Sequence, residues 1–298
     1  MTQTVRETSP VAPLLVRLRG IRPSLSPAEE RVAAVVLDDA AGASRLTISS
    51  LAARARTSET TVLRFCRRLG LRGYPQLRLA LAAEAAQPHA RVPAGSDLSA
   101  DDTIDDIIAT VTFTNASAVE ETTGQLDRTA LVDTATAIAG ARRVDVYGVG
   151  ASAVVGADLQ QKLHRIGVVA FAWNDPHIAL TSATLLRGGD VAVGVSHSGT
   201  TTETIEALAA ARAAGATTVA VTNFPLSRLA VEADLVLTTA ARETSLRSGA
   251  TSSRIAALTV VDCLYLAVAQ RHLARARRAV AATRKAVAGH HVTEDVRD

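Results

Sequence analysis

The chain has 298 residues, of which 48% are hydrophobic and 20% are charged, so it has enough apolar side chains for folded cores and is not a disordered protein. This length predicts about two domains. Residues 1–92 hold 14 Arg against 7 Asp and Glu, a net charge of +7, whereas the remainder holds 18 Lys and Arg against 22 Asp and Glu, a net of −4. A basic segment joined to a mildly acidic one is typical of a nucleic-acid-binding module attached to a domain with another task.

Cysteine usage and hydropathy indicate where the chain works. Cys66 and Cys263 lie in apolar helical patterns without His or Cys partners at metal-ligand spacing, which excludes a disulfide framework and predicts no metal site. The first residues lack the apolar stretch of a signal peptide, and no uncharged apolar run of 18 residues occurs. We therefore expect a soluble cytoplasmic protein that needs no cofactor and does not enter a membrane.

The first third of the chain has the pattern of short helices. An apolar patch within residues 1–24 predicts a short helical arm. Ser26 to Glu29 supply an N-cap, a proline at the first helical position and a glutamate at the third, which predicts the start of a helix. Two further helices are predicted over 48–55 and 58–69. Residues 87–102, rich in Pro, Gly, Ser and Asp, are typical of a linker.

Beyond the linker the hydrophobic period changes. Residues 103–140 have a helical pattern, and short β-branched runs then alternate with alanine-rich helical stretches until a long final helix over 252–288. Strands alternating with helices predict βαβ units and a parallel sheet with helices on both faces. The predicted strands are 143–147, 167–171, 190–195, 217–222 and 235–238. The domain boundaries that follow are 1–86, a linker over 87–102, and 103–298.

The segment from Thr47 to Gly70 is the first with a functional pattern. Its two predicted helices are separated by a tight turn at Arg56 and Thr57, and Ser58 is placed to cap the second helix. At 100° per residue, an apolar face opposes a face of hydroxyls and guanidinium groups. The apolar face holds Val62, Phe65, Cys66 and Leu69, and the polar face holds Thr60, Thr61, Arg64, Arg67 and Arg68. This division is typical of a helix-turn-helix recognition helix, although a solvated amphipathic helix shares it.

Two loops carry the chemistry of the second domain. The first, Gly148 to Ser152, follows a predicted strand and opens a helix, so glycines and free N–H groups could receive a phosphate. Alone it is also a weak dinucleotide fingerprint, with Ala153 at the third glycine position and Asp175 about twenty residues on. The second loop, Ser196 to Thr201, offers several hydroxyls around one glycine, which suits a phosphate monoester and which a dinucleotide does not require.

Two stretches carry a family resemblance. Residues 23–85 resemble the DNA-binding domain of the RpiR family of sugar-phosphate regulators, above all through Ser58 to Gly70 and the Gly73-Tyr74-Pro75 turn. Residues 126–285 resemble the SIS (sugar isomerase) domain through Gly148 to Ser152 and Ser196 to Thr201. The resemblance implies that Ser58, Thr60, Thr61, Arg64, Arg67 and Arg68 face DNA. For the effector it implies that Ser152, Ser196, Ser198 and Thr201 hold the phosphate, together with Gly150, His197, Gly199 and Thr200, while Glu243 meets sugar hydroxyls and Arg247 helps to order the region.

We therefore expect an all-α helix-turn-helix domain followed by an α/β flavodoxin-like domain with a five-stranded parallel sheet. The expected function is operator binding, as a homodimer or homotetramer, modulated by a phosphorylated sugar and without catalysis. One alternative is a sugar-phosphate isomerase with Glu243 and either His177 or His197 as its acid and base. Another is a dinucleotide-binding redox sensor. The sequence assigns no role to Trp173, and for His177 a structural role is as well supported as a ligand contact.

Overall fold

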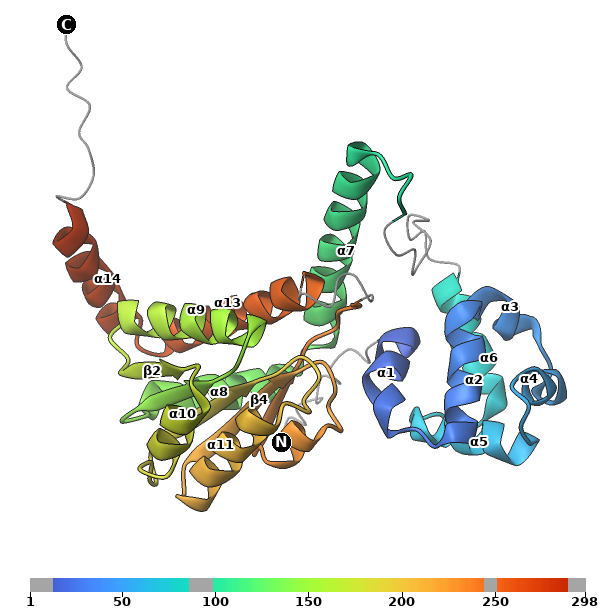
Figure 1. The fold of residues 1–298 in the computed structure, drawn as a ribbon, viewed down its shortest axis with the longest axis horizontal. Helices are drawn as coiled ribbons and strands as arrows, with labels where there is room; N and C mark the ends of the chain where they lie inside the picture. The colour runs from blue at the N-terminus through green and yellow to red at the C-terminus, as the bar shows by residue number, and fades with distance from the viewer. Residues whose placement is uncertain (1–12, 86–98, 244–250, 289–298) are drawn as a thin grey trace, which may run out of the picture. The chain divides into compact units, whose positions relative to one another are not determined.

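The computed structural model describes residues 13–85, 99–243 and 251–288 (Figure 1). The chain divides into two compact units. The first holds residues 1–126, 223–227 and 238–256, and the second holds 127–222, 228–237 and 257–298. This division differs from the predicted boundaries, because the helix after the linker and two short later segments group with the N-terminal helices.

The first unit begins with a bundle of short helices around an apolar core. Their bounds are α1 Leu14–Ile21, α2 Pro27–Asp38, α3 Ala40–Arg45, α4 Ile48–Arg54, α5 Glu59–Arg68 and α6 Tyr74–Ala85. The predicted start of α2 is confirmed: Ser26 and Glu29 form a capping box, in which the Ser26 N–H donates to Glu29 Oε2 at 3.0 Å. Leu14 and Leu18 of α1 are fully buried, so the predicted arm is a helix of the bundle itself.

Two helices of the bundle have no counterpart in the sequence prediction. Asp39 ends α2 and its carboxylate accepts from the Gly42 N–H at 2.7 Å, which starts α3 one residue later. The Gly-Tyr-Pro segment, interpreted as a turn, opens α6, and the Tyr74 hydroxyl donates to the Leu46 carbonyl at 2.9 Å. Buried Leu77 and Leu81 of α6 complete the core of the bundle.

After the linker, α7 (Ile104–Gln125) starts at a capping box formed by Thr103 and Asp106. The second unit then begins with α8 (Arg128–Gly140), capped by Asp127, whose carboxylate accepts from the N–H groups of Thr129 and Ala130. The break between the two helices at Leu126 divides the stretch predicted as helical over 103–140 into two elements.

A five-stranded sheet with the order β2-β1-β3-β4-β5 forms the centre of the second unit. β1 pairs in parallel with β2 and β3, and β3 pairs in parallel with β4. The strands are β1 Val144–Tyr147, β2 Ala170–Trp173, β3 Val191–Val195, β4 Thr217–Thr222 and β5 Leu235–Thr238. All five predicted strands are confirmed, with β2 displaced by two to three residues. This strand order is that of the flavodoxin-like fold.

Helices cover both faces of the sheet, as the apolar strands require (Figure 1). α9 (Ala151–Arg165) and α13 (Ser252–Arg271) lie on one side, and α10 (Pro176–Ala183) and α11 (Thr202–Ala213) lie on the other. Leu208 of α11 and Leu229 of the short α12 (Arg228–Val231) are fully buried against the sheet residues Ala192 and Ala220.

The single long C-terminal helix predicted from the sequence is two helices. His272 leaves the helical region with φ −131° and ψ 50°, and α14 (Leu273–Val287) begins after it. Among the described helices, α13 is long and apolar enough to cross a membrane by length and composition alone, with a mean hydropathy of 1.5. Its buried residues Val260, Leu264 and Val268 are those of a core helix that packs inside a folded unit.

Candidate functional site

The predicted helix-turn-helix is formed by α4, a four-residue connection over 55–58, and α5. Arg56 adopts a positive φ of 48°, and the Thr57 N–H donates to the Ala52 carbonyl at 2.9 Å, which reverses the chain tightly. The Arg31 side chain, from α2, donates to the carbonyls of Ala55 at 3.1 Å and Arg56 at 3.2 Å. The turn is therefore hydrogen-bonded to both α4 and α2, and these bonds fix the direction of α5.

The outer face of α5 agrees with the helical wheel in all but one position. Ser58 caps the helix by accepting from the Thr61 N–H at 3.2 Å. Thr61 itself is buried, with 7% of its surface exposed, so the prediction that it faces DNA is wrong. It lies one turn before buried Phe65 on the same side of the helix, and its hydroxyl pairs with Ser58 Oγ at 3.1 Å. The exposed residues of this surface are Ser58, Thr60, Arg64, Arg67 and Arg68.

Two arginines of this surface are anchored to neighbouring elements. Arg64 Nε lies 3.3 Å from Glu29 Oε1 on α2, and Arg68 donates to the Ser24 carbonyl at 2.7 Å. Burial opposes ionisation of Glu29, but hydrogen bonds from Ser26 and the charges of Arg68 and Arg64 outweigh it and lower its pKa. An ionised carboxylate therefore stands behind the basic face of the recognition helix.

In the second unit, the two predicted loops leave neighbouring strands. Tyr147, the last residue of β1, pairs with Gly194 of β3, so both loops emerge at the carboxyl edge of the sheet at nearly the same level. β1 and β3 are neighbours in the sheet, with β2 on the outer side of β1 and β4 on the outer side of β3. The chain therefore builds the sheet in opposite directions from these two strands. Ligands of open parallel α/β sheets bind at such a switch point.

The first loop turns on a glycine. Gly150 has φ 59° and ψ −129°, a conformation that a residue with a Cβ rarely adopts, and it precedes α9 directly. No side chain caps the start of α9. The N–H groups of Ser152 and Ala153 donate to the carbonyls of Val149 and Gly150 at 3.2 and 3.1 Å, and the positive end of the helix dipole faces this edge. Ser152 is the second residue of the helix and is half-buried at this edge.

The second loop is organised by the buried hydroxyl of Ser196. Ser196 Oγ accepts from the Gly199 N–H at 3.1 Å and lies 2.9 Å from Thr201 Oγ1. Ser198 and Thr200 are exposed, and the Thr200 N–H and hydroxyl both donate to Ser198 Oγ. Thr201 is the N-cap residue of α11 but makes no capping hydrogen bond with its side chain. The loop therefore presents hydroxyls beside a second open helix start.

This arrangement suits a phosphate monoester. Hydroxyls and backbone N–H groups at two helix starts donate several hydrogen bonds to an anion, and the helix dipoles favour its charge. Neither loop contains a Lys or Arg. In the part of the chain that the structure describes, no group of three His, Cys, Asp or Glu side chains could hold a metal ion.

Sequence reasoning missed a buried polar network behind the first loop. Asp145 in β1 is fully buried, and both its oxygens accept from the Arg143 guanidinium, at 2.6 and 2.8 Å. It also accepts from Trp173 Nε1 at 2.8 Å, Ser182 Oγ at 2.6 Å and the Tyr147 hydroxyl at 3.3 Å. Burial and the neighbouring carboxylate raise the pKa of Tyr147. Three polar residues at alternate positions of one strand, 143, 145 and 147, were the signal available in the sequence.

Further residues, outside the two loops, were singled out from the sequence as candidates or left without a role. Glu243, in the first unit, accepts from the Ser253 N–H at 2.7 Å at the start of α13, and Arg247 lies outside the described residues. Asp175 caps α10: its Oδ1 accepts from the Ile178 N–H at 3.0 Å. The carboxylate that the dinucleotide hypothesis required for a ribose therefore has a structural role as a helix cap. His177 is exposed on α10. Trp173, which had no assigned role, belongs to the Asp145 network.

A helix-turn-helix bundle joined to a flavodoxin-like domain with two hydroxyl-lined loops defines the class of transcription regulators that carry a ligand-binding domain. Family comparison agrees. Residues 13–88 match the helix-turn-helix domain of the rpiR family, and residues 137–267 match the SIS domain. The chain is 37% identical to an uncharacterized HTH-type transcriptional regulator of Caldanaerobacter subterraneus, over 87% of this chain and 91% of the relative. The protein belongs to the RpiR family of transcriptional regulators.

Other relatives extend this comparison. The structure of Vibrio vulnificus NanR complexed with ManNAc-6P superposes with a TM-score of 0.61 and 31% identity, covering 94% of this chain and all of that one. The sugar isomerase domain of an RpiR transcription factor from Sphaerobacter thermophilus has a TM-score of 0.56 and 27% identity, covering 60% and 98%. The chain is also 34% identical to the bifunctional protein glk of Burkholderia mallei, over 86% of this chain but only 39% of that protein.

Proposed function

We propose that this protein is a cytoplasmic regulator whose binding to a double-stranded DNA operator is modulated by a phosphorylated sugar. The observation that carries the proposal is the presence, in one chain, of an exposed basic face on α5 and two hydroxyl-lined loops at the switch point of the sheet. A homodimer or homotetramer follows from the geometry of operators, because paired recognition helices read half-sites about one helical turn apart.

The DNA-binding surface is proposed from the exposed residues of α5. Ser58, Thr60 and Arg64 occupy its start and middle, where a recognition helix reaches base edges. Arg67 and Arg68 follow in its last turn, where arginines reach phosphates. The anchoring of Arg64 by Glu29 and of Arg68 by the Ser24 carbonyl supports this assignment, since fixed side chains lose less entropy on binding.

The effector site is proposed from the two loops. Their exposed hydroxyls and open helix starts support phosphate binding, and the relative NanR was solved with the sugar phosphate ManNAc-6P. Glu243 is proposed to meet sugar hydroxyls. The loop residues proposed to hold the effector are Gly150, Ser152, Ser196, His197, Ser198, Gly199, Thr200 and Thr201.

Regulation is proposed to act through a population shift. A sugar phosphate that binds one arrangement of the oligomer more tightly than another changes the spacing of the recognition helices. This task requires no general acid or base at the loops, and we propose none.

Binding of the purified protein to DNA flanking its own gene tests the proposal. The measurement is made at fixed physiological salt with excess competitor DNA, because phosphate contacts alone give sequence-independent binding. A panel of pentose, hexose and amino-sugar phosphates is added in turn. We expect specific binding that one sugar phosphate alters, and turnover of none.

Variants separate the two sites. Arg64→Ala is expected to lose specific DNA binding, whereas Arg165→Ala, an exposed arginine on α9, retains it. Ser198→Ala is expected to bind DNA but lose the response to the effector. Absence of specific DNA binding under every condition, together with turnover of a panel member, would contradict the regulator and support the isomerase.

A further inference from the structure

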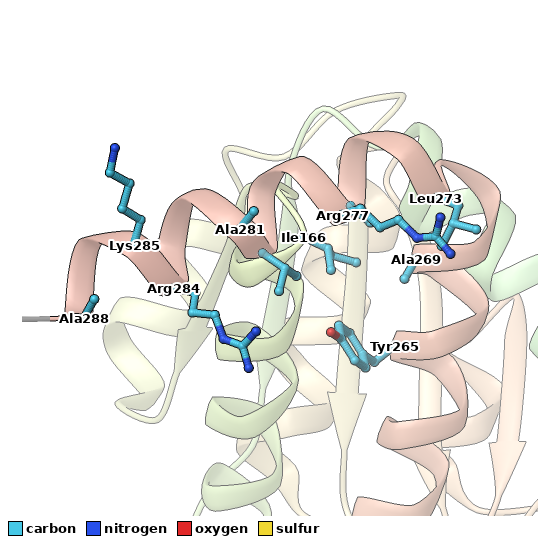
Figure 2. A pocket seen from close by; sticks show the side chains of 11 residues that line it. Ile166, Tyr265, Ala269, Leu273, Arg277, Ala281, Arg284, Lys285 and Ala288 are labelled. Carbon is cyan, nitrogen blue, oxygen red and sulfur yellow. The ribbon is translucent and has the colours of Figure 1, made fainter. Parts of the chain in front are cut away.

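A groove between α13 and α14 in the second unit has a volume of about 620 Å³ (Figure 2). Apolar side chains line most of it, among them Ile166 after α9, Tyr265 on α13, and Leu273 and Val280 on α14. Figure 2 shows Arg284 extending from α14 on the same side as Tyr265, whereas Lys285 points away. The groove is therefore an apolar channel with cations along its α14 edge.

The helix that forms this edge has little cover of its own. Ala276 is the one α14 residue that is buried in the described structure, and the helix is otherwise exposed or half-exposed. α14 carries five cations and no acidic residue. The cations are Arg275, Arg277, Arg278, Arg284 and Lys285. A second α14 would be repelled from this groove, so its occupant must combine apolar side chains with negative charge.

The N-terminal half of α7 has this combination. Ile104, Ile108 and Val111 are 70%, 58% and 45% exposed, and their spacing of four and three residues places them along one stripe of the helix. Asp105 lies beside this stripe, and Asp101 and Asp102 precede Thr103, the N-cap residue of the helix. A contiguous exposed apolar stripe flanked by charge is typical of an interaction surface.

We propose that the α7 stripe of one copy of this chain docks into the α13–α14 groove of a second copy, with the reciprocal contact completing a symmetric dimer. The stripe supplies aliphatic side chains to an apolar channel, and its aspartates meet Arg277 and Arg284. The dimer is itself part of the proposed function, and this inference adds the surface that forms it. Because α7 follows the predicted linker over 87–102 in the sequence, this contact links the association of two copies to the C-terminal end of their DNA-binding domains.

Charge-reversal variants of the full-length protein, followed by sedimentation velocity at micromolar concentration, test this docking. One variant carries Asp101→Lys and Asp105→Lys, and the other carries Arg277→Glu and Arg284→Glu. Each alone is expected to associate at least tenfold more weakly than the parent, because like charges meet in its homodimer. An equimolar mixture is expected to recover parental association, since both contacts of the heterodimer pair opposite charges. Asp106 is left unchanged because it caps α7.

Controls use matched positions outside the two surfaces. Ile108→Asp is expected to weaken association, whereas Leu226→Asp, at 57% exposure, does not. Arg278→Glu, on α14 outside the groove lining, is also expected to be neutral. Parental association in both charge variants, or no recovery on mixing, overturns the docking but leaves a regulator that associates through another face. Loss of DNA affinity in Arg277→Glu/Arg284→Glu with unchanged association overturns it in favour of DNA in the groove.

Discussion

Glu29 of α2 lies directly behind Arg64 of α5, with Oε1 and Nε 3.3 Å apart, while its other oxygen accepts from Ser26. One buried carboxylate therefore caps one helix and orients the exposed arginine of another. Glu29→Gln keeps the shape of the side chain but removes the charge. We expect the unfolding free energy of the bundle to fall by about 1 kcal/mol, because Gln can still complete the capping box but its hydrogen bonds with Ser26 and Arg64 no longer involve an ionised carboxylate. Specific DNA binding should weaken with it. Chemical denaturation measures the first effect and a DNA titration the second.

The same carboxylate gives a pH dependence of defined sign. The folded-state pKa of Glu29 is lower than its unfolded value, so its stabilisation is complete above about pH 4.3, the unfolded pKa, and is lost as pH falls through the folded pKa. The stability difference between parent and Glu29→Gln should therefore be present at pH 7 and shrink in acid. Glu30→Gln is the control, because Glu30 is more exposed, pairs with an exposed Arg22 and should change stability less. A difference that persists unchanged at low pH would contradict this account.

Two adjacent threonines of α5 distinguish the exposed face from the buried one. Thr60→Val removes an exposed hydroxyl and is expected to weaken specific DNA binding about tenfold, as loss of a base or phosphate contact does. Thr61→Val alters a buried position with a side chain of the same shape, so DNA binding should stay within about twofold of the parent. Titrations of both variants on one operator fragment compare them directly, and equal losses would return Thr61 to the DNA-facing set.

The Asp145 network holds β1, β2 and α10 together below the first loop. Asp145→Asn leaves the Arg143 guanidinium without its ionised partner. We expect a loss of about 3 kcal/mol in unfolding free energy, the lower end for breaking a buried pair, because Arg143 is 22% exposed. Asp133→Asn, an exposed position on α8, serves as the control and should change stability little. A loss in Asp145→Asn no larger than in this control would show that the network is not structural.

Gly150 is predicted to be sensitive for a backbone reason. Gly150→Ala forces a Cβ onto a residue with φ 59° and should cost about 1–3 kcal/mol of strain. Relief of this strain would shift the start of α9 and the Ser152 hydroxyl away from a bound phosphate, so sugar-phosphate affinity should fall by at least an order of magnitude. Isothermal titration with the active sugar phosphate measures it. Gly140→Ala, at the end of α8 where a Cβ meets nothing, is the control.

Cys66 is expected to be unreactive in the folded protein. Its thiol is fully buried in the bundle, and burial raises its pKa to about 11, so almost no thiolate is present at pH 8. In a Cys263→Ser variant, labelling with a thiol reagent at pH 8 should require unfolding. Rapid labelling of the native variant would indicate that the bundle opens locally.

Local patterns predicted much of this molecule. The Ser26–Glu29 capping box, the Ser58 N-cap and the five β-branched runs were each sufficient to locate an element, because the interactions that define them lie within a few residues. The apolar arc of α5 was also correct, except at Thr61. That residue lies at the edge of the arc, where burial depends on how closely α5 packs against its neighbours, and periodicity does not contain this information.

Contacts between residues far apart in the sequence could not be predicted from local patterns. The tie between Glu29 and Arg64 joins positions 35 residues apart, and the Asp145 network joins two strands and a helix. The break at His272 involves no proline or glycine, so no turn signal marked it. The alternation of Arg143, Asp145 and Tyr147 was visible, but only the position of Ser182 and Trp173 explains why a charged residue lies inside a sheet.

The absence of Lys and Arg from the two loops has a consequence for how the protein responds to its surroundings. In the proposed function, α5 attracts DNA through guanidinium groups, and such binding falls steeply as added salt competes for the phosphates. The proposed effector site holds its phosphate through neutral hydroxyls and N–H groups at short range, where ionic screening is weaker. Osmotic changes in cell potassium would therefore alter the affinity for the operator far more than the intrinsic affinity of the DNA-free protein for the sugar phosphate. Because the two sites are proposed to be coupled, the effector response of the DNA-bound protein would change with salt only through its operator affinity.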